Sequence, residues 1–140
     1  MREHETRVTV RFCEVDTYGV AWHGHYLAWM EMGRNALAAE FGLGVSQLAE
    51  CGFLAPVIDL ALKYRRPARF NEELIILTSA RRMDTATLAF DSRILGADGS
   101  LRATGRTVHA LTDMDGILQY KLPEVVSPRL AAMLAWTESP

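Results

Sequence analysis

The chain has 140 residues, of which 49% are hydrophobic and 23% are charged, and its formal net charge is -2. This size and composition are those of an ordinary globular protein, so we expect residues 1–140 to form a single domain with its own core. The near-neutral charge argues against nucleic acid as a partner, and no stretch approaches the roughly 20 apolar residues that span a bilayer.

The N-terminal segment MREHETRVTV is charged and contains no apolar run followed by a cleavage site, which predicts a cytoplasmic protein. The two cysteines, Cys13 and Cys51, are too few for a disulfide framework, and we expect both to be buried free thiols. Residues Thr6–Cys13 alternate between apolar and polar side chains, with Val10 and Phe12 on the apolar face. This period of two predicts a half-buried strand.

A loop and a long helix are predicted next. Residues 16–24 contain two glycines and turn-forming polar side chains, which indicate a loop. Over residues 25–41 the apolar side chains recur at spacings of three and four, which predicts a largely buried helix. Gly33 costs this helix about 1 kcal/mol relative to alanine, so we expect another backbone to pass close to it. Gly42 is a candidate C-cap, and Ser46 is a candidate N-cap of a short helical turn.

Strand patterns dominate the remainder of the chain. The short connections between them favour antiparallel neighbours, and Pro128 begins a last helix. The long buried helix must lie across one face of this sheet, which predicts an α+β fold with the sheet curved around the helix. The open edge strands favour a homodimer, or a dimer of dimers, joined edge to edge. The predicted strands are Leu54–Tyr64, Glu73–Met83, Thr85–Leu95, Leu101–Thr112 and a short Ile117–Tyr120.

The order of elements and two motifs resemble those of the hotdog fold, and more closely the 4-hydroxybenzoyl-CoA thioesterase family with its Tol-Pal-associated acyl-CoA thioesterase branch. One motif is LKYRRPARFNEELIILT at residues 62–78, which resembles the family's Tyr-x-x-Pro-Ala followed by a turn and a strand. The chain departs from the family at His25, where Asn is common, and at residues 71–72, where an Asp pair is common. The other motif is VRFCEVDTYGVAWHGHYLAWMEMGR, with matching positions at Asp16, Gly19, Trp22–His23, Gly24 and Tyr26–Leu27.

The resemblance implies an antiparallel sheet wrapped around a long central helix, and a thioesterase that hydrolyses an acyl- or aroyl-CoA without a metal or cofactor. It also implies that Asp16 acts as nucleophile or general base, that the helix N-terminus polarises the carbonyl, and that His23 lines the site. A related branch carries its catalytic carboxylate on the central helix, which makes Glu31 a second candidate. The alternative role of Glu31 is an ion pair with Arg34.

The chemistry of the residues fits the same reaction. Thioester hydrolysis needs a carboxylate that attacks or takes a proton from water, and donors aimed at the developing oxyanion. Asp16 supplies the carboxylate, although an aspartate at this position also forms turns. The unsatisfied amides around His23, Gly24 and His25 lie at the positive end of the helix dipole and supply the donors. The His25 side chain either contacts the substrate or caps the helix.

Binding of CoA requires cations for its phosphates and an apolar channel for its pantetheine arm. The arginines Arg65, Arg66 and Arg69 lie in an exposed turn, where they either contact phosphate or discourage edge aggregation. Three aromatic side chains near the loop are candidates for the substrate pocket, or else for core and dimer contacts. They are Tyr18, Trp22 and Tyr26.

Four other interpretations can be weighed against the residues. His23 and His25 are possible zinc or iron ligands, but at a helix start their side chains diverge by roughly 200°, and the sequence holds no further ligand cluster. A hotdog domain that binds acyl-CoA without cleaving it, and a thioesterase that acts on an acyl-carrier protein, are open alternatives because a motif does not measure turnover. A hotdog dehydratase needs a helix histidine with a partner carboxylate, which the sequence does not show.

Overall fold

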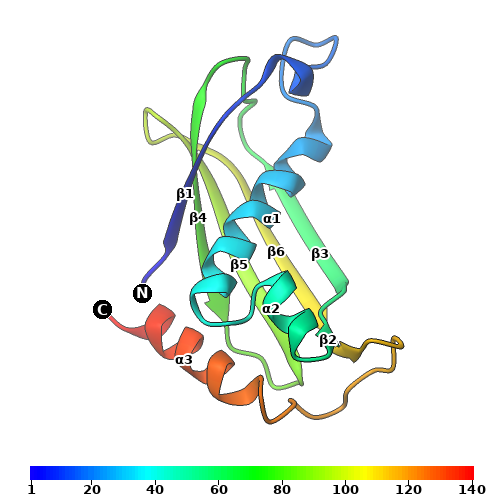
Figure 1. Ribbon diagram of the computed structural model, residues 1–140. Coiled ribbons are helices and arrows are strands. Elements are labelled where there is room, and N and C mark those ends of the chain that lie inside the picture. Colours follow the sequence, from blue (N-terminus) through cyan, green and yellow to red (C-terminus); the bar gives the residue numbers. More distant parts are fainter.

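The computed structural model describes residues 1–140 and consists of an antiparallel sheet with one long helix lying across its concave face (Figure 1). The main sheet has five strands in the order β1-β4-β5-β6-β3, and β2 pairs separately with β7. This arrangement confirms the predicted α+β hotdog fold. The strands are β1 (His4–Thr9), β2 (Phe53–Leu54), β3 (Val57–Tyr64), β4 (Glu73–Arg81), β5 (Thr87–Gly96), β6 (Leu101–Ala110) and β7 (Thr112–Asp113), and the helices are α1 (His23–Glu40), α2 (Val45–Glu50) and α3 (Ser127–Glu138).

The central helix α1 buries one continuous stripe against the sheet, as its spacing of apolar residues predicts. At Gly33 a Cβ atom would lie 2.6 Å from Thr78 Oγ1 and 2.9 Å from Ile76 Cγ2. These neighbours are side chains of β4, so the expectation of a close backbone is wrong. Glycine is required here because β4 presents two branched side chains to the helix at short range. None of the helices has both the length and the apolar character that crossing a membrane requires.

The first strand ends earlier than its alternation predicts. β1 stops at Thr9, and residues Phe12–Glu14 form a 3-10 turn. The Glu14 carboxylate accepts the backbone N–H of Arg11 at 2.7 Å and so closes this turn. As a result Phe12 is 80% exposed, and Cys13 is exposed instead of buried, while Cys51 is half-buried; both are free thiols. The predicted strand to Cys13 and the burial of its thiol are therefore wrong.

The sheet order differs from the sequence order at β3. Strand β3 pairs with β6 rather than with β4, the next strand along the chain, and it forms one edge of the sheet. The predicted single strand Leu54–Tyr64 is interrupted at Pro56, which has no N–H to donate to a ladder. Residues Ile117–Tyr120 form only an isolated bridge through Leu118 and no strand. The antiparallel series β4, β5 and β6 follows the prediction.

Candidate active site

Asp16 lies in a tight loop between the 3-10 turn and α1. Its amide donates to the carbonyl of Val20 at 2.9 Å, and its own carbonyl accepts the amide of Gly19 at 3.0 Å. Asp16 Oδ1 accepts the amide of Tyr18 at 2.8 Å, which is the turn-forming role that the sequence left open. No hydrogen bond engages Oδ2, so one carboxylate oxygen is available for a reaction.

The start of α1 offers two free backbone donors. The helix begins at His23, and its N-cap residue Trp22 makes no side-chain hydrogen bond to it. The amide of His25 donates to the carbonyl of Trp22 at 3.0 Å, whereas the amides of His23 and Gly24 have no partner. These two N–H groups lie at the positive end of the helix dipole. They are the donors that a developing oxyanion requires.

A cavity of about 330 Å³ joins the loop to the helix start. We call it the Asp16 cavity. The Tyr26 side chain is buried and its hydroxyl accepts the Ala68 amide at 2.9 Å. The Tyr64 hydroxyl donates to the His23 carbonyl at 2.6 Å, which ties the helix start to β3. The cavity brings together six of the predicted site residues, which are Asp16, Tyr18, His23, Tyr26, Arg65 and Arg66, and it is also lined by Val20, Ala21, Tyr64 and Pro67.

Four of the predicted site residues do not line this cavity, namely Trp22, Gly24, His25 and Arg69. The Trp22 indole lies directly over Gly24, where any Cβ would overlap it. Its ring centroid is 4.8 Å from that of His23 and 5.5 Å from that of His25. His25 follows His23 by two positions, so the helical period directs their side chains apart. The Gly24 amide has no hydrogen-bond partner, and the side-chain position of this residue is covered by the indole.

The turn that carries Arg65 and Arg66 is held by a buried ion pair that the sequence analysis missed. Arg102 of β6 donates to the Glu72 carboxylate at 2.7 and 3.1 Å and to the Pro67 carbonyl at 3.0 Å. The hydrogen bond from Arg102 holds the pKa of Glu72 below its ordinary value, against the opposing effect of burial. Since a strand arginine and a turn glutamate are 30 residues apart, no local pattern pairs them. Arg65 and Arg66 themselves make no ion pair and face the cavity.

Glu14 also holds the loop around Asp16 in place, and no sequence pattern predicted this role. Its side chain is buried and accepts the indole N–H of Trp29 at 3.1 Å. Its carbonyl accepts the amide of Trp22 at 2.8 Å, so this one residue links the loop to both the start and the core of α1. Burial raises the pKa of Glu14, but the hydrogen bonds from Arg11 and Trp29 outweigh burial and the net pKa is lowered. The carboxylate therefore stays charged and fixes the loop.

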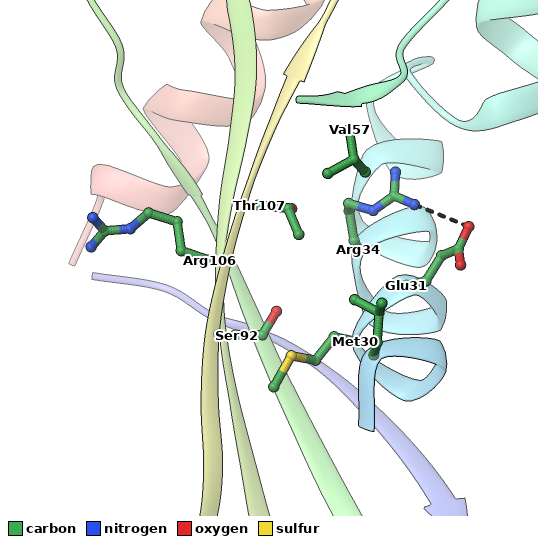
Figure 2. A pocket seen from close by; sticks show the side chains of 9 residues that line it. Met30, Glu31, Arg34, Val57, Ser92, Arg106 and Thr107 are labelled. Carbon is green, nitrogen blue, oxygen red and sulfur yellow. Dashed lines mark ion pairs between the residues drawn. The ribbon is translucent and has the colours of Figure 1, made fainter. Parts of the chain in front are cut away.

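Glu31, the alternative carboxylate, lies away from the Asp16 cavity. Its side chain is 64% exposed and lies 3.3 Å from the Arg34 guanidinium. The dashed line in Figure 2 marks this ion pair. The ion pair suggested by the sequence is thus confirmed. No group of three His, Cys, Asp or Glu side chains gathers into a metal-binding arrangement in residues 1–140. Of Asp16 and Glu31, only Asp16 shares a cavity with His23, the first residue of α1.

Comparisons with known proteins agree with this architecture. A family model of the thioesterase-like superfamily matches residues 10–130. The chain is 28% identical to a Bacillus subtilis protein provisionally named acyl-CoA thioesterase YneP, over 82% of this chain and 83% of that protein. It is 28% identical to the acyl-CoA thioester hydrolase YbgC of Escherichia coli, over 67% and 70% of the two chains. The crystal structure of protein TT1821 from Thermus thermophilus, 30% identical, superposes with a TM-score of 0.84 over 94% of this chain and 99% of that one.

The fold and the loop-to-helix cavity define a hotdog protein of the thioesterase class. More particularly, the chain belongs to the thioesterase-like superfamily, whose model covers most of its length. The predicted enzyme class, a thioester hydrolase, is confirmed at the level of this family. The finer resemblance to the 4-hydroxybenzoyl-CoA family and its Tol-Pal-associated branch stays a prediction.

Proposed function

We propose that the protein hydrolyses acyl-CoA thioesters in the Asp16 cavity. The observation that carries this proposal is that Asp16, whose Oδ2 makes no hydrogen bond, lines the same cavity as His23, the first residue of α1, whose amide has no partner. A nucleophile or base and a pair of oxyanion donors are the two parts that thioester hydrolysis needs. The names of the relatives YneP and YbgC support CoA as the thiol carrier.

The reaction follows from these positions. Asp16 either attacks the thioester carbonyl or takes a proton from a water molecule that attacks it. The carbonyl electron pair moves onto oxygen, where the His23 and Gly24 amides stabilise it. Collapse of the intermediate breaks the carbon–sulfur bond and releases CoA as a thiol after protonation. In the nucleophilic route a water molecule then cleaves the acyl-aspartate anhydride, so both routes give a free carboxylic acid.

The mouth of the cavity carries groups suited to CoA. Arg65 and Arg66 are exposed and make no ion pair, so their guanidinium groups are available to phosphate oxygens. Tyr18 is 87% exposed at the same mouth and offers an aromatic face to the pantetheine arm or the adenine. Arg69 does not line the cavity, but it lies in the same turn as Arg65 and Arg66. Its charge therefore adds to the positive potential around the cavity.

The test is free-thiol release from short, long and aromatic acyl-CoAs by the wild type and by Asp16→Asn. The asparagine retains an Oδ1 acceptor for the Tyr18 amide, so the loop keeps its hydrogen bond while the carboxylate is lost. We expect turnover on at least one thioester and a fall of about a hundredfold or more in the variant. Full activity in a folded Asp16→Asn variant would remove Asp16 from the chemistry.

Two alternatives are separated by the same assay. Release of thiol from an acyl-carrier protein but from no acyl-CoA would assign the carrier protein as the substrate, since the bond cleaved is identical. Tight binding of acyl-CoA without any release would define a binding domain instead of an enzyme. The position of a free carboxylate oxygen in the cavity favours hydrolysis over simple binding.

We also propose that the protein assembles through β3. This edge strand has no partner on its outer side, and its apolar side chains are exposed, with Ile58 at 61%, Val57 at 50% and Leu60 at 42%. An unpaired apolar edge invites pairing with a second copy. Pairing of two β3 strands gives a homodimer. Two such dimers form a dimer of dimers if they associate through another face of the protein.

A further inference from the structure

A second hollow lies along α1, beyond the Asp16 cavity. One part, of about 100 Å³, is lined by Leu27 and Met30, and the other, of about 550 Å³, by apolar residues such as Leu48 and Phe90. The two parts share Glu31, Arg34 and Val57, so Arg34 stands at their junction. We call the two parts together the α1–β3 cavity. Figure 2 shows Met30 extending from α1 toward Ser92, and the Arg34 guanidinium turned toward Glu31.

The guanidinium of Arg34 is partly buried and has few protein partners. Its side chain is only 14% exposed, and its one ionic neighbour is Glu31 at 3.3 Å, whose own side chain is 64% exposed. No hydrogen bond from the five N–H donors of Arg34 is found. Burial lowers the pKa of Arg34, and Glu31 offsets this only in part. A half-buried guanidinium whose donors make no hydrogen bond to the protein, at the wall of an apolar cavity, favours an anionic ligand.

The other polar groups of the cavity do not compete for that ligand. His109 is buried, and its Nδ1 must carry the proton because it faces the Ala55 carbonyl at 3.0 Å, which can only accept. Its Nε2 then accepts the hydroxyl of Thr107 at 2.9 Å, so this pair is internally satisfied. Arg106, at the edge of the smaller part, is paired with Asp91 at 2.9 Å on the opposite face of the sheet. Arg34, paired only with the exposed Glu31, is thus the cation of the cavity that is best placed to take a ligand anion.

The two cavities follow one stripe of α1. His23 lines the Asp16 cavity, Leu27 is one turn further along, and Arg34 is about 16 Å from His23 along the helix axis. The Arg34 side chain leans back toward the helix N-terminus. Its guanidinium is therefore closer to an acyl chain held at the start of α1 than the spacing of the backbone positions indicates. Leu27, which lines the smaller part of the α1–β3 cavity, is 36% exposed and gives an apolar surface one turn from His23. The two cavities share no lining residue, so a methylene chain that joins them has to cross this surface.

We propose that the protein prefers thioesters of dicarboxylic acids, with the acyl chain lying along α1 and its distal carboxylate bound by Arg34. This inference rests on the proposed function, because it places the thioester carbonyl at the start of α1. The apolar walls of the cavity hold the methylene chain, while the Arg34 fork pairs with the carboxylate. The Glu31 carboxylate then remains on the solvent side of Arg34. Its negative charge repels the distal carboxylate of the ligand and weakens binding.

The test compares matched thioesters that differ only at the distal end, namely suberoyl-CoA against octanoyl-CoA, and adipoyl-CoA against hexanoyl-CoA. We expect the wild type to prefer the dicarboxylic member, and Arg34→Met to reduce the ratio of the two kcat/KM values by about 10- to 100-fold. Arg34→Lys should retain part of the preference, and Glu31→Gln should increase it because a repulsive charge is removed. Equal losses on both members of a pair would overturn the proposal.

Binding measurements distinguish this proposal from the proposed function. Suberate and octanoate are titrated into the wild type and Arg34→Met by calorimetry. If no thioester is cleaved but suberate binds only when Arg34 is present, the hydrolase assignment fails and the carboxylate site stands. If Arg34→Met instead changes the oligomeric mass in light scattering and leaves the dicarboxylate preference intact, Arg34 pairs with a second copy of the chain and the proposal is wrong.

Discussion

The ion pair between Arg102 and Glu72 should be a main determinant of stability near the active site. The Arg102 side chain is 9% exposed and that of Glu72 is 29% exposed. Glu72→Met removes the nearer of the two carboxylates at this buried guanidinium and leaves Asp98 at 3.8 Å, which costs about 3 kcal/mol of unfolding free energy. Two hydrogen-bond acceptors of Arg102 survive this substitution, the Pro67 carbonyl at 3.0 Å and the Ser100 hydroxyl at 2.9 Å. We therefore expect the loss of unfolding free energy to lie at the lower end of the roughly 3–5 kcal/mol typical of a broken buried ion pair. Arg102→Met should cost less, about 1–2 kcal/mol, because the more exposed Glu72 can turn to water.

Urea unfolding followed by tryptophan fluorescence measures these effects. The double variant Glu72→Met/Arg102→Met leaves no buried charge, so it should cost about 2 kcal/mol instead of the sum of the single losses. The exposed pair Arg82–Glu138 provides a matched control, and Glu138→Met should leave the urea midpoint unchanged. Additive losses, or a loss below about 1 kcal/mol in Glu72→Met, would refute the view that desolvation of Arg102 governs this turn.

Three further results are expected. Gly33→Ala should destabilise the protein by about 1 kcal/mol, because overpacking against Thr78 and Ile76 outweighs the gain in helix propensity; adding Thr78→Ala should recover part of the loss, since the Ile76 contact at 2.9 Å remains, and a loss unchanged by Thr78→Ala would place the strain elsewhere. Burial lowers the pKa of His109, so stability should decline as pH falls below about 6.5, where the unfolded chain takes up a proton and the folded chain resists it; an NMR titration of the His109 ring with an ordinary midpoint would contradict this. Light scattering should give a dimeric mass for the wild type and a monomeric mass for Ile58→Lys on the β3 edge; a monomeric wild type would exclude edge pairing.

The helix and the meander were predictable from the sequence because their periodicity is local. α1 follows the spacing of apolar residues over residues 25–41, and β4 to β6 follow alternation with short turns. The place of β3 was not predictable, because its ladder with β6 joins residues far apart in the chain. The interruption at Pro56 and the 3-10 turn closed by Glu14 depend on single backbone and side-chain hydrogen bonds that periodicity does not record.

The candidate site was predictable in part. The motif around Asp16 placed the carboxylate and the start of α1 within one short stretch, and the structure brings Asp16 and His23 to one cavity. The divergence of His25 from His23 follows from the helical period alone. The position of the Trp22 indole over Gly24, and the Arg102–Glu72 pair under the arginine turn, are tertiary contacts without a local sequence signal. Arg34 was recognised only as the partner of Glu31, because its burial in a cavity depends on β3.

The most direct test of the proposed chemistry compares three carboxylate-to-amide substitutions in one thiol-release assay on the best acyl-CoA. The variants are Asp16→Asn in the cavity, Glu31→Gln on α1, and Asp84→Asn as a control at an exposed position. We predict that Asp16→Asn loses about a hundredfold or more of kcat, with an unfolding midpoint like that of the wild type, while Asp84→Asn keeps full turnover. A hundredfold loss in Glu31→Gln together with full activity in Asp16→Asn would contradict the proposal and move the reaction to the middle of α1.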